Sequence, residues 1–199
     1  MTLWKLLQTN KAQMHPLFFA AQHYVVPLYI AASSACLVLF GLHCGGGRTA
    51  EGIWWLAAWG ILTALLLAFV PLMRRRVLKD ELARYDFDVE KVPPREQWTV
   101  GEGEDAVSFD RFGMTAHGVL RYYNHLSPTL TAVNTFYRVH LFIRFINDAD
   151  GFVLRLPVEA WTLRMLKDCG IRLTNQDKLD VLLADKEKAF RTILNKGRL

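Results

Sequence analysis

Two uninterrupted apolar stretches dominate the first third of the chain. No Asp, Glu, Lys or Arg occurs between Lys11 and Arg48, or between Glu51 and Arg74. As a helix, the second stretch (residues 53–73) would be about 30 Å long, which is the thickness of the hydrocarbon core of a bilayer. A buried helix of a soluble protein rarely runs this long without a polar face. The pattern therefore predicts a membrane-spanning helix.

The first apolar stretch predicts another spanning helix over residues 24–43. Pro27 lies in its opening turn, where proline is tolerated. Ser33 and Ser34 can bond to carbonyls of their own helix, so they do not oppose insertion. The stretch is too long and begins too late for a signal peptide. We therefore expect a helical hairpin whose arms are joined by a glycine-rich loop, residues 44–52.

Positive charge follows the second apolar stretch at once, at Arg74, Arg75, Arg76 and Lys79. The loop between the helices carries one arginine against one glutamate. Because positively charged flanks stay on the cytoplasmic side of a membrane, we predict cytoplasmic termini and an external loop. A lysine or arginine at an anionic leaflet contributes about 1 kcal/mol, so these four cations are interpreted as a membrane-surface anchor.

After this basic segment, short alternating runs replace the continuous apolar pattern. Pro93 and Pro94 end any helix. Val139, Leu141 and Ile143 belong to a period-two series that runs from residue 137 to 145 and is the strongest strand signal in the chain. Turn residues at 101–105, 110–113 and 147–151 separate this strand from shorter ones.

The C-terminal part returns to helical spacing. A helix is predicted from Val158, with Gly170 as its C-cap. A last helix, residues 175–195, would place Leu179, Leu183, Phe190 and Leu194 on one side. Strands followed by helices indicate an antiparallel α+β module rather than a parallel α/β one. The predicted segments are 1–23 (N-terminal, cytoplasmic or interfacial), 24–43 (spanning helix), 44–52 (external loop), 53–73 (spanning helix), 74–94 (basic juxtamembrane helix and linker), 95–173 (α+β domain) and 174–199 (C-terminal helix).

A segment beginning "VSFDRFGMTAHG" at Val107, followed by a long strand, a turn and "FVLRLPVEAW", resembles the C-terminal domain of the YcxB-like family of bacterial membrane proteins. The match covers residues 98–166 together with the two-helix layout upstream, and its hinge is Leu156, Pro157 and Trp161. The resemblance implies two transmembrane helices in the bacterial inner membrane. It also implies a small cytosolic antiparallel barrel or sheet, similar to a pleckstrin-homology (PH) domain and capped by C-terminal helices.

The sequence offers no constellation typical of catalysis or metal binding. Asp148, Asp150 and Gly151 superficially match a calcium loop, but Ile146 and Pro157 fall at its ligand positions. The six histidines are not paired at helical spacing. We therefore expect no enzyme activity, metal or cofactor. The net charge of +5 owes much to the arginine run, which argues against nucleic acid as a partner.

One strand face combines basic and aromatic residues. Arg138, His140 and Arg144 alternate with the apolar row, although Phe142 and other apolar side chains share their face. Such a face could meet anionic headgroups or an acidic protein segment. The preferred interpretation is plainer: a mixed sheet face partly covered by the C-terminal helix.

The leading functional hypothesis is a non-enzymatic interaction or regulatory protein held at the membrane. The alternative is an accessory subunit of a transporter or secretion complex. In that case the small residues Ala31, Ala32, Ser34 and Ala35 would pack against another helix. The expected partners are the lipid bilayer and a membrane protein or a second copy of the chain.

Overall fold

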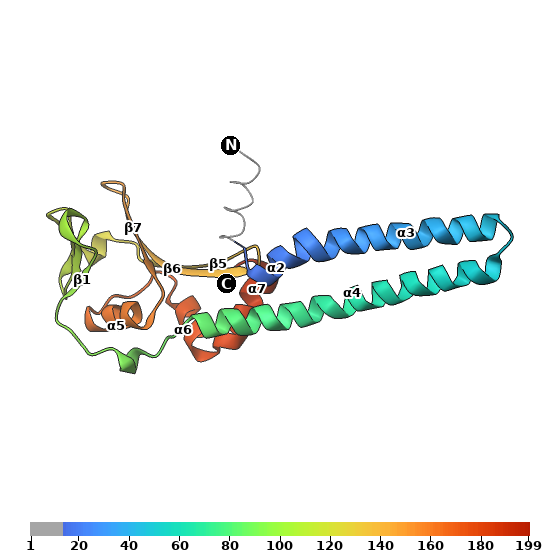
Figure 1. Ribbon diagram of the computed structural model, residues 1–199. Coiled ribbons are helices and arrows are strands. Elements are labelled where there is room, and N and C mark those ends of the chain that lie inside the picture. The colour runs from blue at the N-terminus through green and yellow to red at the C-terminus, as the bar shows by residue number, and fades with distance from the viewer. Residues whose placement is uncertain (1–13) are drawn as a thin grey trace. The chain divides into compact units, whose positions relative to one another are not determined.

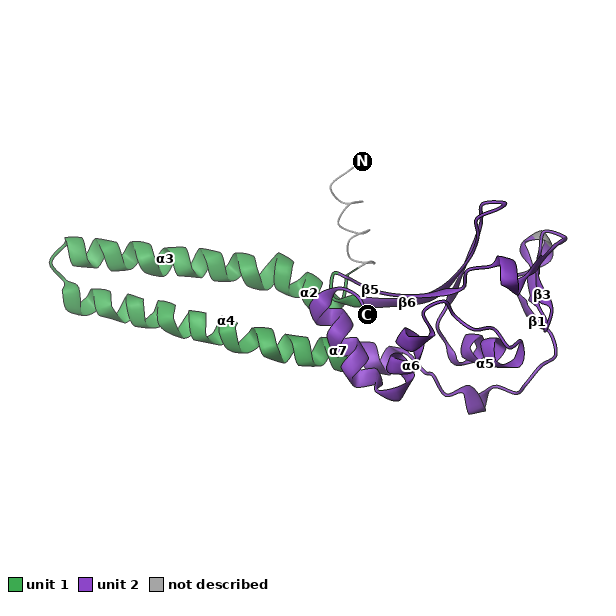
Figure 2. Cartoon of the chain, turned by 180° about the vertical axis from the view of Figure 1, so that it is seen from behind, with its two compact units in different colours: residues 1–79, 136–138 green, residues 80–135, 139–199 purple. Residues whose placement is uncertain are grey.

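The computed structural model describes residues 14–199, so the predicted interfacial pattern over residues 1–13 lies outside the described part. The chain divides into two compact units (Figure 2). Unit 1 contains the residues up to 79 together with 136–138. Unit 2 contains residues 80–135 and 139–199.

Unit 1 is the helical hairpin that the apolar stretches predict (Figure 1). Its first arm is continuous from a short helix through a π-helical turn into α3. Both arms are long and apolar enough to cross a membrane. Only residues 46–48 lie between the helices, fewer than the predicted loop of 44–52. The elements are α2 (Pro16–Ala20), η1 (Ala21–Val25), α3 (Val26–Gly45) and α4 (Thr49–Arg84).

Helix α4 passes through the basic segment without a break. It includes Pro71, which removes one backbone hydrogen bond but leaves the 36-residue helix intact. The predicted spanning segment and juxtamembrane helix are therefore one element. Its last residues, from Asp80 to Arg84, belong to unit 2.

Unit 2 contains two antiparallel sheets, with strand orders β1-β2-β3-β4 and β5-β6-β7. The predicted α+β class, with antiparallel strands followed by helices, is confirmed. The described strands form two separate sheets and close no barrel between them. The strands are β1 (Trp98–Val100), β2 (Val107–Phe109), β3 (Gly113–Ala116), β4 (Val119–Tyr122), β5 (Thr129–Thr135), β6 (Arg138–Asn147) and β7 (Phe152–Pro157).

Strand β6 confirms the period-two prediction, because its odd-numbered residues are buried and its even-numbered residues are half-buried. The sequence did not reveal the turn before it. Phe136 and Tyr137 have φ angles of 50° and 61°. Positive φ at both central residues is the pattern of a two-residue hairpin turn that usually takes Asn or Gly. This turn separates β5 from β6, the strand that the alternation predicts.

The predicted last helix is wrong in one respect, because it is two helices. The chain breaks at Asp185 (φ −145°, ψ 84°), whose side chain accepts a hydrogen bond from the Lys188 amide at 2.9 Å and caps the second helix. Within α6, before the break, Leu182 is buried together with Leu179, whereas the predicted Leu183 is exposed. The helices of unit 2 are α5 (Ala160–Asp168), α6 (Gln176–Ala184) and α7 (Lys186–Lys196), with short 3-10 turns η2 (Val89–Lys91), η3 (Gly103–Asp105) and η4 (Tyr123–His125).

The two sheets share one core. Phe109 of β2 and Phe145 of β6 are fully buried, and their ring centroids lie 5.6 Å apart. The C-terminus covers the free edge of β5, since the Asn134 amide donates to the Gly197 carbonyl at 2.9 Å. Among the described strands, β7 pairs with β6 alone and forms the opposite edge of its sheet.

Candidate functional site

Side chains from the end of α4 hydrogen-bond the edge of β6 where no described strand pairs with it. The last bond from the β7 side to β6 runs from the Val158 amide to the Leu141 carbonyl. Beyond that point, the Val139 amide donates to the buried Glu81 carboxylate at 2.9 Å. The Tyr85 hydroxyl donates to the Val139 carbonyl at 2.7 Å. Both polar groups of the Val139 backbone are thus satisfied by side chains from the end of α4.

Lys186, at the start of α7, caps the same helix end. Its ammonium donates to the Leu82 carbonyl at 2.7 Å and also to the Tyr85 carbonyl. Leu82 belongs to the last turn of α4 and Tyr85 follows it directly. The carbonyls at a helix C-terminus have no intrahelical donors. Burial lowers the pKa of Lys186, and the Asp86 carboxylate acts in the opposite direction. Three segments of unit 2 therefore meet where α4 ends.

A groove of about 650 Å³ opens beside this junction, between the end of α4, the β6–β7 edge and the start of α5. Aromatic side chains form much of its wall, and three basic side chains line it as well. The aromatic residues are Tyr85, Phe142 and Trp161, and the basic residues are Arg84, His140 and Arg155.

The two carboxylates that line the groove are already engaged. Asp86 is 2.6 Å from the Lys91 ammonium. This hydrogen bond, with a smaller contribution from the Asp88 amide, lowers the pKa of Asp86. Glu159 accepts a hydrogen bond from the Trp161 indole at 2.9 Å. Of the two groove arginines, Arg84 lies 3.8 Å from the Glu81 carboxylate. Arg155 has no ion pair among the described residues, so it is the arginine available to a ligand.

The residues predicted as a partner face are separated. Arg138 is half-buried and belongs to unit 1. His140 lines the groove of unit 2. Arg144 lies farther along β6, where it is paired with Arg155 of β7. Every even-numbered residue of β6 is half-buried, and both interpretations of this face stay predictions.

The four cations interpreted as an anchor all lie on α4. Arg74, Arg75, Arg76 and Lys79 are exposed and belong to unit 1. Their exposure is compatible with a surface role, but no described contact tests that role.

Sequence reasoning missed Arg84 and Arg155 as site residues. They lie 71 positions apart, and only the tertiary structure brings them to one groove. The hinge motif did contain Pro157 and Trp161, which line the groove, but it pointed to the fold rather than to a site.

No protein-family model, curated protein or solved structure matches this chain. The chemistry of the groove therefore rests on its own residues. Within residues 14–199, no group of three or more His, Cys, Asp or Glu side chains is placed to hold a metal ion. Aromatic walls with guanidinium groups suit a ligand that combines an apolar or flat part with an anionic group.

Proposed function

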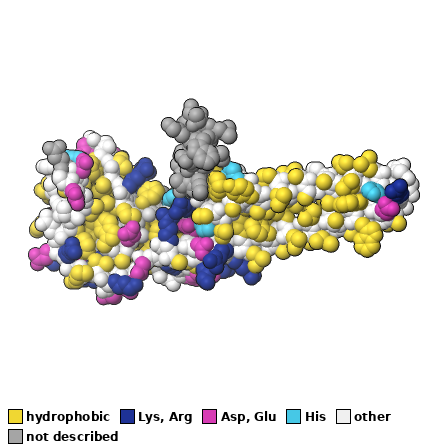
Figure 3. All heavy atoms as spheres, viewed as in Figure 1, with side chains coloured by type: hydrophobic (Ala, Val, Ile, Leu, Met, Phe, Trp, Pro, Cys, Tyr) yellow, Lys and Arg dark blue, Asp and Glu magenta, His cyan; other side chains and the backbone are white. Residues whose placement is uncertain are grey.

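We propose that this chain is a membrane-anchored, non-enzymatic interaction or regulatory protein whose hairpin crosses the bilayer twice. The observation that carries the proposal is the outward exposure of large apolar side chains along both arms. Trp54 is 76% exposed and Leu67 is 68% exposed. Figure 3 shows apolar side chains over the visible face of α3 and α4. Such a surface is stable in lipid and prone to aggregate in water.

The charge pattern supports an orientation with both termini in the cytoplasm of a bacterium and the short loop outside the inner membrane. The loop end carries Arg48 with Glu51 close by, their charged groups 3.8 Å apart. The opposite end of α4 carries the exposed cations from Arg74 to Lys79, without a neighbouring acid until Asp80. This asymmetry is what the positive-inside rule describes.

In this proposal, unit 2 is the part that meets a partner, and the groove beside α4 is its contact site. The groove combines a cavity, aromatic walls and the guanidinium group of Arg155, which has no ion pair among the described residues. These are common features of binding sites. The order of antiparallel strands followed by helices supports a PH-like arrangement. The YcxB-like assignment stays a prediction.

The second candidate, an accessory subunit of a transporter or secretion complex, is favoured by one feature of unit 1. Ala31, Ser34 and Ala35 are exposed on α3 at spacings of three and four residues. Small residues on one helix face allow close approach of another helix in a membrane. Ala31→Leu combined with Ala35→Leu should reduce the size of the complex in detergent if this surface is used. An unchanged size would exclude it.

The experiment that tests the main proposal compares groove variants in the full chain. The tagged protein is crosslinked in cells and extracted gently, and its partners are quantified by mass spectrometry. Wild type should retain a stoichiometric partner that Trp161→Ala and Arg155→Glu both lose. Arg172→Glu, an exposed change elsewhere in unit 2, should retain it. Equal recovery in all variants, or turnover of a metabolite or nucleotide by the purified protein, would contradict the proposal.

A further inference from the structure

Two arginines face each other across the edge of the second sheet. The β6–β7 register pairs Arg144 directly with Arg155. The Val158 amide donates to the Leu141 carbonyl, so the hydrogen-bonded pairs fall at the odd-numbered residues of β6. Arg144 and Arg155 therefore form a non-hydrogen-bonded pair, in which Cα atoms lie about 4.5 Å apart and side chains are closest.

Neither arginine has a carboxylate partner among the described residues. The Nε atom of Arg144 is buried and makes no hydrogen bond within that part of the chain. Arg155 is exposed, and its guanidinium lies 5.6 Å from the centroid of the Phe142 ring. Like charges directly opposite each other destabilise a strand pair, and a buried unpaired donor adds a further cost.

Two arginines elsewhere in the same unit are paired with carboxylates. Arg121 is 2.7 Å from the Asp150 carboxylate, and Arg164 is 3.0 Å from the Asp168 carboxylate. By contrast, none of the three strands β5, β6 and β7 contains an Asp or Glu. Arg144 and Arg155 therefore place two positive charges opposite each other on strands that carry no acidic residue.

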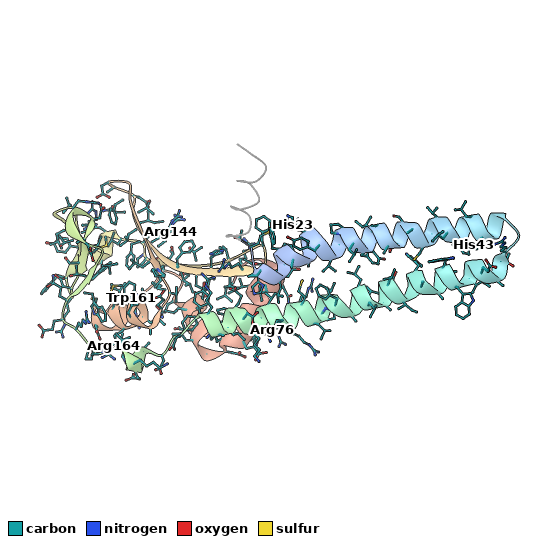
Figure 4. The ribbon with its side chains drawn as sticks, viewed as in Figure 1. His23, His43, Arg76, Arg144, Trp161 and Arg164 are labelled. Carbon is teal, nitrogen blue, oxygen red and sulfur yellow. The ribbon has the colours of Figure 1, made fainter. Side chains whose placement is uncertain are left out.

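Arg155 can be reached from solvent and from the groove, and Arg144 is half-buried beside it. Arg155 and Phe142 both line the groove as well as the sheet face. Figure 4 shows Arg144 on the side of the β6–β7 ribbon away from helix α5. An anionic group held by the two arginines would thus leave the rest of its molecule against Phe142 and the aromatic wall.

We propose that Arg144 and Arg155 bind the phosphate group of a phosphomonoester, with Phe142 contacting its organic part. A phosphomonoester carries a charge of about −1.5 to −2 and three acceptor oxygens. It can therefore neutralise both guanidinium groups, whereas a single carboxylate neutralises one. Guanidinium forks also match phosphate oxygens in bidentate geometry. This ligand class applies to the groove surface that we proposed as the contact site, so the inference rests on the proposed interaction function.

The test uses the full chain in nanodiscs of neutral phosphatidylcholine, with phenyl phosphate as the soluble probe. Binding is measured by isothermal titration and by the shift in melting temperature. Each of Arg144→Gln and Arg155→Gln should weaken binding by about 10-fold to 100-fold, as expected for loss of a charged hydrogen bond. Phenyl sulfate, which carries one negative charge, should bind more weakly than phenyl phosphate. The control Arg172→Gln should leave the affinity unchanged.

A second arm replaces part of the lipid with phosphatidic acid, whose headgroup is a phosphomonoester. A stabilisation that depends on both arginines only in these discs would identify a headgroup as the source of the phosphate. The same dependence on phenyl phosphate in neutral discs would identify a soluble ligand. Both outcomes support the site.

Three outcomes would overturn the site. The first is arginine-independent binding in both arms, the second is equal affinity for phenyl sulfate, and the third is no binding in either arm. Glutamine variants that lose their melting transition without ligand would show that the arginines are structural instead. The proposed anchoring role is tested separately by topology labelling, so failure of one proposal does not imply failure of the other.

Discussion

In the hairpin, Leu67 exposes most of its surface, whereas in unit 2 Phe145 exposes none. Both residues are large and apolar, and both lie in regular elements. Burial of apolar surface stabilises a fold in water by about 25 cal/mol per Å². The same transfer gains nothing in lipid, where the surroundings are already apolar. The contrast therefore indicates that the hairpin is suited to lipid and unit 2 to water. Substitutions should act differently in the two units.

The largest effect is expected in the core of unit 2. Phe145→Ala leaves a cavity against Phe109 and should lower the free energy of unfolding of unit 2 by about 3–5 kcal/mol. Hydrogen exchange of β6 amides in the detergent-solubilised full chain would measure it. The matched change Leu67→Ala should leave those amides unaffected. Equal loss of protection in both variants would break the contrast between the units.

On the hairpin, a charge at an exposed position should be costly, although exposed positions of a water-soluble protein tolerate it. Leu65 is exposed, so Leu65→Arg would be nearly neutral in a water-soluble protein. In a bilayer it should oppose insertion by about 2.5–3.5 kcal/mol. The measurement is the fraction of protein that resists carbonate extraction from membranes. Retention equal to that of Leu65→Ile would argue against a spanning helix.

The junction at the end of α4 should show a smaller effect. Tyr85→Phe removes the hydroxyl that bonds the Val139 carbonyl and should destabilise the junction by about 1 kcal/mol. Faster hydrogen exchange should be confined to the residues of β6 that follow the hairpin turn. As a control, Tyr122→Phe removes a hydroxyl from an exposed strand residue. If the two variants exchange alike, the Tyr85 bond adds no stability.

The smallest effect concerns thiol reactivity. Burial raises the pKa of Cys169, and its contact with Tyr123 acts in the opposite direction. The thiolate is the nucleophile. Alkylation of Cys169 should therefore stay slow at neutral pH and become faster only when the pH exceeds the ordinary pKa of a cysteine. Cys44 is less buried and should react first. Mass spectrometry of partly alkylated protein measures both rates, and a faster Cys169 would contradict its burial.

The hairpin and strand β6 could be predicted because each is specified by one simple pattern of apolar residues. An apolar run of spanning length and a strict alternation from Val139 to Phe145 each depend only on local sequence. The break at Asp185 was missed because Leu183 and Phe190, on either side of it, fit the spacing of one continuous helix. The turn at Phe136 and Tyr137 was missed because aromatic residues rarely adopt positive φ.

The groove could not be predicted from the sequence for a different reason. Its side chains come from the end of α4, from β6, from β7 and from α5, and no local spacing connects them. The pairing of Arg144 with Arg155 likewise depends on the β6–β7 register, which the intervening turn sets. Alternation did place Arg144 on the correct strand face, but it gave no sign of the second arginine.

The most direct test of the account is the location of the two units relative to the membrane. Arg48 lies in the loop between α3 and α4, and Asp148 lies in the exposed turn between β6 and β7. Single-cysteine variants Arg48→Cys and Asp148→Cys, in a chain with its three native cysteines replaced, are treated with a membrane-impermeant maleimide in intact cells. The account predicts labelling of Arg48→Cys at once and of Asp148→Cys only after the membrane is permeabilised. Labelling of both positions in intact cells, or the reverse order, would contradict a hairpin that spans the membrane with unit 2 inside.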